Sequence, residues 1–449
     1  MTVATGSSEI GARVRADMKR VREELERLVR IPGTSHPGGD PKDLRRSAEE
    51  TARILEDAGL QTQLLEVAGA PAAVLGRIPA PAGAPTVLCY AHHDVQPTGP
   101  RELWRTDPFE PVEKGGRLYG RGTSDDKCGI AIHAAAVRAW GAKPPVGVTV
   151  FIEGEEEWGS PNLAAFLAKY GDLMRADAVI LADSGMWRAG DPAITVSLRG
   201  IVACDIEVRT LDHAVHSGEF GGPTPDALTV LAKTLAKLHD DKGNVAVPGI
   251  AKGTADPLDL TEKELREQTG MRPGVRIIGD GGITDHMWAR PAVSILGIDS
   301  PRIEGSTNQL VPSARARVSM RIPPGQDSDA AMEALTRHLR ASVPWGAEVT
   351  ITPKGAGKPY KVDASGPAFA AMERAMRDAW GKPAVHMGQG GTIPFVADFN
   401  RAFPKAALLL TGAADPTSNA HSENESVDLH DLEKSCAAEA LFFSYLAQA

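Results

Sequence analysis

Paired cysteines, long apolar runs and an excess of basic charge are all missing from this sequence of 449 residues. Its four cysteines lie far apart and form no Cys-x-x-Cys pair, which excludes a cysteine zinc knuckle and fits reduced thiols. No apolar run approaches the roughly 18 residues that a membrane-spanning helix needs, and the N-terminus lacks the pattern of a secretory signal. A net charge of -9 argues against a nucleic-acid partner. We therefore expect a soluble, cytoplasmic protein that binds neither membranes nor nucleic acids.

The apolar periodicity of the chain indicates an α/β fold. At 449 residues the chain exceeds the size at which a single core keeps growing, so we expect two domains. Apolar residues spaced by three and four predict amphipathic helices over 9–31 and 43–58. Short apolar runs then alternate with helical segments, as in an α/β sheet. The expected strands are 73–78, 86–90, 148–152, 178–181 and 406–410, with helices over 129–140 and 161–170 between them.

The pattern changes at Leu198. The stretches IVACDIEV and ARARVSMRI alternate apolar and polar residues, as strands with one solvated face do. Two further helices are expected over 225–239 and 329–341. Together these elements predict a smaller α+β domain over 198–353, inserted into a larger domain made of 1–197 and 354–449. Residues 242–304 are rich in Gly, Pro and charge, and we expect them to be irregular or elaborated.

Imidazole and carboxylate groups follow four of the expected strands. TVLCY runs into AHHDVQP, VTVFI into EGEEEWGS, AVILA into Asp183, and ALLLT into a loop with NAHSENES. A further loop, LYGRGTSDDKCG, places Asp125 where a dinucleotide-binding motif requires its last glycine, which argues against a nucleotide loop. Ligands of open α/β sheets bind outside the carboxyl ends of the strands, so we expect these side chains to meet.

Each of these motifs is weak by itself, because a histidine after a strand is usually a surface residue and an acidic run usually faces water. Carboxylates gathered at one sheet edge, however, repel one another and destabilise the fold unless cations compensate. Two divalent ions do this, and histidines mixed with carboxylates suit zinc, manganese or cobalt better than calcium. The combined motifs therefore predict a metal centre.

The motifs also carry a resemblance to a known family. YAHHDVQP, LYGRGTSDDK, EGEEEWGS, DSGMW, LRG, HSGEFGG, GGTIP and AHSENE resemble, in order over about residues 85–425, the signature of a metallopeptidase family. That family includes the carnosinases and cytosolic nonspecific dipeptidases, aminoacylases, acetylornithine deacetylase, succinyl-diaminopimelate desuccinylase and glutamate carboxypeptidase. The resemblance implies a catalytic α/β/α sandwich with a mixed, mostly parallel sheet and an inserted lid and dimerisation domain. It also implies a homodimer with two divalent ions per subunit, zinc first, with manganese or cobalt as alternatives.

The resemblance assigns roles to individual residues. The implied metal ligands are His92, Asp125, Glu157, Asp183 and His421. Asp125 would bridge both ions, Asp183 would join His92 on one of them, and Glu157 and His421 would hold the other. Asp94 would orient the His92 ring, and Glu156 would be the general base. His216, in the inserted domain, would donate a hydrogen bond to the oxyanion, and in dimeric members it reaches the partner subunit's site.

Substrate contacts are implied in the same way. Arg321, in VSMRIPP, matches the family's carboxylate-binding arginine, and its alternative is a cross-strand ion pair. The implied loop contacts are Asn308, Gly390, Gly391 and Thr392, and for the glycine loop a plain tight turn is the alternative. VQP, LRG and the long segment 242–304 resemble the dipeptidase branch. We therefore expect a metallodipeptidase, or a carboxypeptidase-like enzyme, that cleaves short peptides with a free C-terminal carboxylate.

Three other functions remain open from the residues. An N-acyl-amino-acid deacylase uses the same catalytic groups and is the first alternative. A metal-binding scaffold without turnover has no need of a base such as Glu156. A binuclear phosphoesterase needs cations beside the metals, and only Arg121 and Lys127 lie near in sequence. Cys128 departs from the glycine that most relatives have after DDK, and we expect it to fill a small buried space rather than to bind metal.

Overall fold

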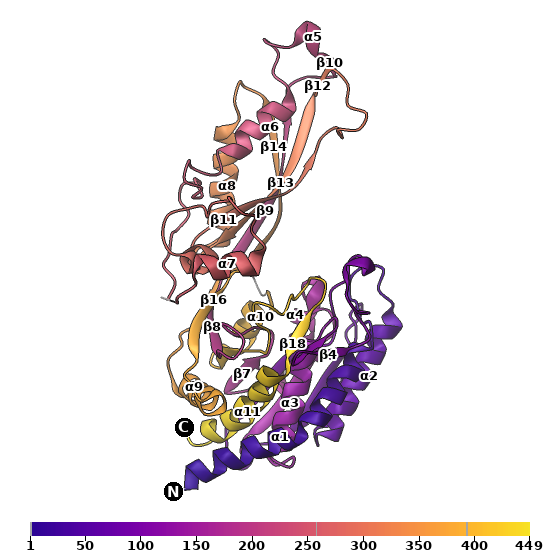
Figure 1. Ribbon diagram of the computed structural model, residues 1–449, viewed down its shortest axis with the longest axis vertical. Coiled ribbons are helices and arrows are strands. Elements are labelled where there is room, and N and C mark those ends of the chain that lie inside the picture. The colour runs from indigo at the N-terminus through magenta and orange to yellow at the C-terminus, as the bar shows by residue number, and fades with distance from the viewer. Residues whose placement is uncertain (1, 257, 392–393) are drawn as a thin grey trace. The chain divides into compact units, whose positions relative to one another are not determined.

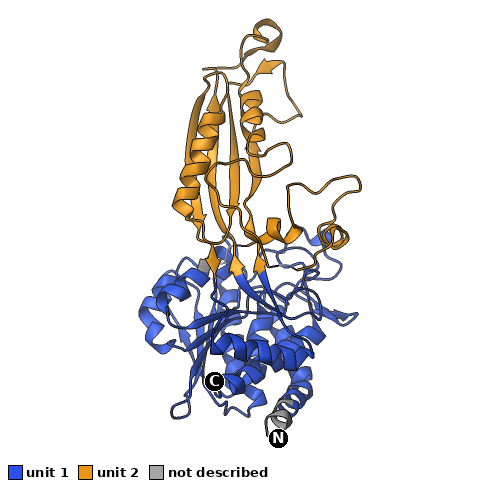
Figure 2. Ribbon diagram, turned by 90° about the vertical axis from the view of Figure 1, so that its left-hand side faces the viewer, with its two compact units in different colours: residues 1–196, 362–387, 394–449 blue, residues 197–361, 388–393 orange. Residues whose placement is uncertain are grey.

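The described residues divide into two compact units. A computed structural model describes residues 2–256, 258–391 and 394–449 (Figure 1). Unit 1 comprises 1–196, 362–387 and 394–449, and unit 2 comprises 197–361 and 388–393 (Figure 2). Across the described residues, no helix has both the length and the apolar character needed to cross a bilayer.

A mixed nine-stranded sheet has most of its strands in unit 1. Its main path runs β1 (Gln61–Leu65), β2 (Ala73–Ile78), β6 (Gly147–Glu153), β3 (Thr86–His92), β7 (Ala178–Leu181), β17 (Ala407–Leu410), β8 (Ala193–Leu198) and β15 (Tyr360–Lys361), and β16 (Val385–Gln389) pairs with β8. The central strands β6, β3, β7 and β17 are parallel, and antiparallel strands flank them. The five strands predicted from apolar runs all lie in this sheet, because strands buried on both faces read as nearly continuous apolar segments.

Helices cover both faces of this sheet, as successive residues of β3 show. The Tyr90 ring lies 4.4 Å from the ring of Phe395 on α10 (Pro394–Ala402), measured between centroids. The preceding residue, Cys89, points to the opposite face, where its thiol donates to Glu439 on α11 (Leu429–Leu446). The predicted α/β/α sandwich is therefore confirmed.

The remaining helices of unit 1 form two groups. On the α11 side, α1 (Thr2–Val29), α3 (Lys127–Ala139) and α9 (Pro367–Trp380) contact α11, and α2 (Pro41–Asp57) contacts α1 and α3 (Figure 1). On the α10 side lies α4 (Leu163–Tyr170), which packs against α10. A small antiparallel sheet of β4 (Val112–Lys114), β5 (Arg117–Tyr119) and β18 (Ser426–Asp428) joins two loops that are distant in sequence.

Unit 2 is an α+β layer built on a four-stranded antiparallel sheet. The strand order is β11 (Ala292–Asp299), β13 (Ser313–Ile322), β9 (Gly200–Arg209) and β14 (Glu348–Gly357). Alternate residues of β9 and β13 form a core with α6 (Ala227–Ala236) and α8 (Ser328–Ser342). The smaller elements are β10 (Val215–His216), α5 (Ser217–Phe220), α7 (Glu262–Thr269) and β12 (Gln309–Leu310).

One predicted boundary in this part of the chain needs correction. Residues 242–304, expected to be irregular or elaborated, contain α7 and the sheet strand β11, whose apolar residues are mostly exposed and so give no buried-strand pattern. The predicted boundary at 353 falls inside β14, and unit 2 continues to Lys361. Pro353 is tolerated within β14 because β14 is an edge strand with a register shift after Pro353.

Candidate metal centre

The carboxyl ends of the parallel strands bring the predicted ligands together in unit 1. Strand β3 ends at His92, and Asp183 follows β7. Glu157 lies in a 3₁₀ turn, Glu156–Trp158, shortly after β6. Asp125 precedes α3, and His421 lies in the loop between β17 and β18.

Asp125 stands between the two histidines. Its Oδ1 lies 3.1 Å from Nε2 of His92, and its Oδ2 lies 2.9 Å from Nε2 of His421. Asp183 Oδ1 is 3.9 Å from His92 Nε2, and Glu157 Oε2 is 3.1 Å from His421 Nε2. Two donor sets therefore share one carboxylate: His92 with Asp183 on one side, and His421 with Glu157 on the other.

Glu156 lies at the first of these sets. Its Oε2 is 3.9 Å from His92 Nε2, and donor atoms of His92, Glu156 and Asp183 all lie within 4.8 Å of one another. Burial, and then the charge of Asp183, raises the pKa of Glu156 well above its ordinary value. A carboxyl group in this state is suited to taking up a proton.

Burial and neighbouring groups also shift the pKa values of the other predicted ligands. Burial and the nearby charge of Asp125 raise the pKa values of both Asp183 and Glu157. Hydrogen bonds to Asp125 and Glu157 raise the pKa of His421 to about 11. Among the described residues, the ion pairs of these carboxylates are formed with His92 and His421. Divalent cations fit this donor set because carboxylates and imidazoles are their common ligands.

Asp94 supports this cluster at two points. The His92 Nδ1 atom lies 3.1 Å from the Asp94 carbonyl oxygen and 3.3 Å from its Oδ1, so Asp94 orients the ring. The Asp94 carboxylate also accepts hydrogen bonds from the backbone amides of Glu156 and Glu157, at 3.2 and 3.0 Å. It therefore positions the glutamate turn as well as the histidine.

Sequence reasoning gave no role to Gln96, which holds Glu157. Its backbone amide donates to Glu157 Oε1 at 3.1 Å, and its side-chain amide donates to Glu157 Oε2 at 2.8 Å. The only signal for Gln96 in the sequence was the VQP triplet, which indicated a resemblance to the dipeptidase branch but did not predict a contact with Glu157.

The two cations near the site are already engaged. The Arg121 guanidinium pairs with Glu425 at 2.8 Å, and Lys127 Nζ donates to the carbonyl oxygens of Leu28 and Ile31 at 2.8 and 2.7 Å. Both side chains are buried. These pairings disfavour a phosphoesterase, which needs free cationic groups for phosphate charge.

Two other residues near the motifs have packing roles. Cys128 is buried, and its thiol contacts the Ser124 carbonyl oxygen at 3.4 Å. His93 Nε2 lies 2.9 Å from the carbonyl oxygen of Ala72, so its ring points away from His92 and the carboxylates.

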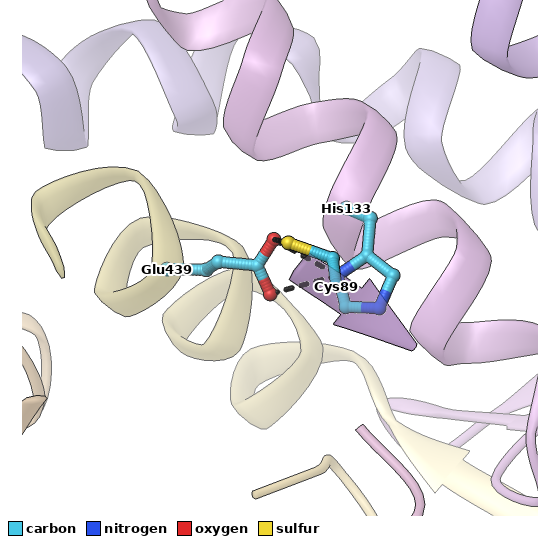
Figure 3. Close-up of side chains that lie close together, drawn as sticks. All are labelled: Cys89, His133 and Glu439. Carbon is cyan, nitrogen blue, oxygen red and sulfur yellow. Dashed lines mark hydrogen bonds and ion pairs between the residues drawn. The ribbon is translucent and has the colours of Figure 1, made fainter. Parts of the chain in front are cut away.

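A second buried group of potential ligands, Cys89, His133 and Glu439, comes from β3, α3 and α11 (Figure 3). Nδ1 of His133 lies 2.9 Å from both carboxylate oxygens of Glu439, its Nε2 lies 3.1 Å from the Tyr90 carbonyl oxygen, and the Cys89 thiol donates to Glu439. These hydrogen bonds pair the polar groups of the three side chains within the core, so we interpret the group as a structural cluster.

The predicted oxyanion donor and substrate contacts belong to unit 2. His216 is exposed on β10, and its Nδ1 accepts the backbone N–H of Gly218 at 3.0 Å. The neutral ring therefore carries its proton on Nε2, which is free to act as the donor. Asn308 precedes β12, whose Gln309 pairs with His216.

Arg321 lies on β13, where its paired neighbours Ala292 and Ile201 are uncharged. Burial lowers the pKa of Arg321. Burial, and then the charge of Arg321, lowers the pKa of Arg199 to about 10. Arg199 Nε donates to the Gly390 carbonyl oxygen at 3.3 Å, which links the glycine loop to this pair of guanidinium groups. Gly391 follows in the same loop, and Thr392 lies outside the described residues.

Comparisons with known proteins show which proteins this chain resembles. The family model described as peptidase family M20/M25/M40 matches residues 88–444. The cysteinylglycine-S-conjugate dipeptidase of Corynebacterium striatum is 33% identical over 438 residues, which cover 94% of this chain and 95% of that protein. The human β-Ala-His dipeptidase is 28% identical over 455 residues, covering 96% of this chain and 86% of that protein. The solved structure of the dipeptidase Dug1p from Saccharomyces cerevisiae shares the fold, with a TM-score of 0.81, 23% identity and full coverage of both chains.

Proposed function

Because this chain belongs to peptidase family M20/M25/M40, we propose that it is a metal-dependent dipeptidase that cleaves dipeptides or short peptides with a free C-terminal carboxylate. The observation that carries the proposal is the position of Asp125 between His92 and His421, each with its own second carboxylate. The similarity to two dipeptidases over most of their length supports the choice of substrate class.

The donor set supports two divalent ions. His92, Asp125 and Asp183 would hold one ion, and Asp125, Glu157 and His421 would hold the other. Zinc is the first choice for imidazole and carboxylate ligands, with manganese and cobalt as alternatives. When bound, such ions polarise the scissile carbonyl and lower the pKa of a water molecule toward neutrality.

The protein's own residues supply the remaining chemistry. Glu156 accepts a proton from the attacking water on its carboxylate and returns it to the leaving amine. His216 donates from Nε2 to the oxyanion that develops on the carbonyl oxygen. Arg321, with the loop of Gly390 and Gly391, binds the α-carboxylate of the leaving amino acid, and Asn308 is a polar contact to the substrate.

Metal analysis combined with a dipeptide-library digest tests this function. We expect turnover that a chelator abolishes and that divalent zinc, manganese or cobalt restores, with release of two free amino acids. Carboxylate release from N-acetyl amino acids without dipeptide cleavage would instead identify an N-acyl-amino-acid deacylase. Phosphate-ester turnover without peptide cleavage would reject both assignments.

We also propose a homodimer formed through the edge of unit 2. Strand β11 is the terminal strand of its sheet and exposes Ile295, Leu296 and Ile298, a combination that favours pairing with another strand. Ile298→Lys should convert the protein to monomers in sedimentation experiments, whereas Val275→Lys, at an exposed apolar position outside this strand, should not. A parent protein that is already monomeric at micromolar concentration would reject the dimer.

The four cysteines are free and buried, which supports the proposed cytoplasmic location. Recovery of the native protein in a secreted or membrane fraction of its source cells would contradict that location.

A further inference from the structure

We propose that Glu425 is a positioning residue: it sets the geometry of the loops that carry Asp125 and His421, and so determines how tightly the protein binds metal. The inference rests on the metal centre proposed above. Neither the motif analysis nor the family match assigns a role to this side chain, which lies four residues after His421.

The Glu425 carboxylate is a buried acceptor for the Asp125 loop. Oε1 accepts from the backbone amides of Ser124 and Asp125, at 2.9 and 3.1 Å, and from the Ser124 hydroxyl at 3.0 Å. Oε2 accepts from the Gly122 amide at 2.9 Å and from Arg121 at 2.8 Å. The side chain is 0% exposed, so each of these donors would be costly to leave unpaired.

The backbone of Glu425 reinforces the same connection. Its carbonyl oxygen accepts the Gly120 amide at 2.9 Å, and β18 begins at the next residue and pairs with β5. Glu425 therefore binds the Asp125 loop through both its side chain and its main chain.

The loop that leads to Glu425 needs such support. His421 and Asn424 have φ values of +63° and +61°, in the left-handed region that residues other than glycine seldom occupy. Such conformations persist where the surroundings hold them. Since the His421 ring must meet Asp125 and Glu157, the anchored Glu425 fixes the end of the segment that presents it.

Arg121 extends the connection to the loop after His92. While one guanidinium nitrogen pairs with Glu425, the other donates to the Pro97 carbonyl oxygen at 3.1 Å. Its charge also offsets the buried carboxylate, whose pKa is raised by burial. The pair thus connects the loops that carry Asp125 and His421 with the loop that follows His92.

The test compares metal affinity in two variants that each lose a buried carboxylate. Glu425→Gln removes the charge and leaves an amide that cannot accept all of the donors. Glu24→Gln is the matched control, because Glu24 on α1 is 1% exposed, pairs with Arg20 and Arg138 at 2.8 and 2.9 Å, and within the described part of the chain forms no hydrogen bond or ion pair with a predicted ligand. Both variants should lower the Tm of the metal-free protein.

Only Glu425→Gln should weaken metal binding. We expect its Zn²⁺ affinity, measured by chelator competition, to fall by about 10–100-fold, the scale for losing a group that orients metal ligands. Its Co²⁺ absorption spectrum should change as well, whereas Glu24→Gln should match the parent in both measurements. Parent-like Zn²⁺ affinity in folded Glu425→Gln would overturn the inference, as would an equal loss in Glu24→Gln.

Should Glu425→Gln fail to fold, Ser124→Ala removes one donor and leaves the charge pair intact. Its Zn²⁺ affinity should fall by about 2–10-fold, the equilibrium cost of one hydrogen bond, and an unchanged affinity would overturn the inference. A parent protein that binds no Zn²⁺ and cleaves no dipeptide would instead reject the proposed function, and this inference with it.

Discussion

Replacing Glu156 by glutamine separates catalysis from metal binding. The carboxylate lies 3.9 Å from His92 and is not one of the five predicted ligands, so the metals should stay bound. A positioned general base contributes roughly 10²–10⁴-fold to the rate. We therefore expect kcat to fall by that factor, which corresponds to about 2.7–5.5 kcal/mol of transition-state stabilisation.

The same variant should stabilise the metal-free protein. The pKa of Glu156 is raised by burial and by Asp183, whereas in the unfolded chain the group ionises near pH ~4.3. The folded state is therefore penalised increasingly as the pH rises above that value, and glutamine removes the penalty. The gain in Tm should be larger at pH 8 than at pH 4.

Steady-state kinetics on a dipeptide, with metal content measured by mass spectrometry, provides the assay. Glu155→Gln is the matched control, because the adjacent carboxylate is also buried but accepts from the amides of Asn162 at 3.0 and 3.1 Å. Glu155→Gln should keep its kcat. The assignment of Glu156 as the base is refuted if Glu156→Gln, with its full metal content, keeps more than about a tenth of the parent kcat.

Two further predictions concern unit 2. His216→Ala should keep both metals and lose roughly 100-fold or more in kcat, as expected for a lost oxyanion donor, and unchanged turnover at full metal content would contradict that role. Asp205→Asn should change the acid stability, because hydrogen bonds from Arg317 and Lys354 lower the pKa of Asp205 to about 2. The stability from this depressed pKa is fully present above the unfolded value near pH ~4 and is lost as the pH falls toward 2. Urea titrations at several pH values should show a smaller loss over this range in the variant, and identical pH dependence would contradict the assignment.

Local sequence was sufficient for the central strands and for the order of the polar loops. The five apolar runs became β2, β3, β6, β7 and β17 because strands buried on both faces need apolar residues at every position. Since parallel strands end at one edge, the residues that follow them were expected to meet, and the structure brings His92, Asp125, Glu157, Asp183 and His421 together.

Tertiary structure alone decided which carboxylate oxygen faces which histidine nitrogen in the metal centre, and which residues support the predicted ligands. Asp125 divides its two oxygens between histidines that are more than 300 positions apart in the chain, and Glu425 joins its loop across a similar separation. β11 escaped prediction because its exposed apolar side chains follow no burial pattern. The apolar periodicity of a segment indicates how that segment packs against the core. Hydrogen bonds between distant loops depend instead on the packing of the whole unit. The sequence therefore determined the kind of site, and the fold determined its geometry.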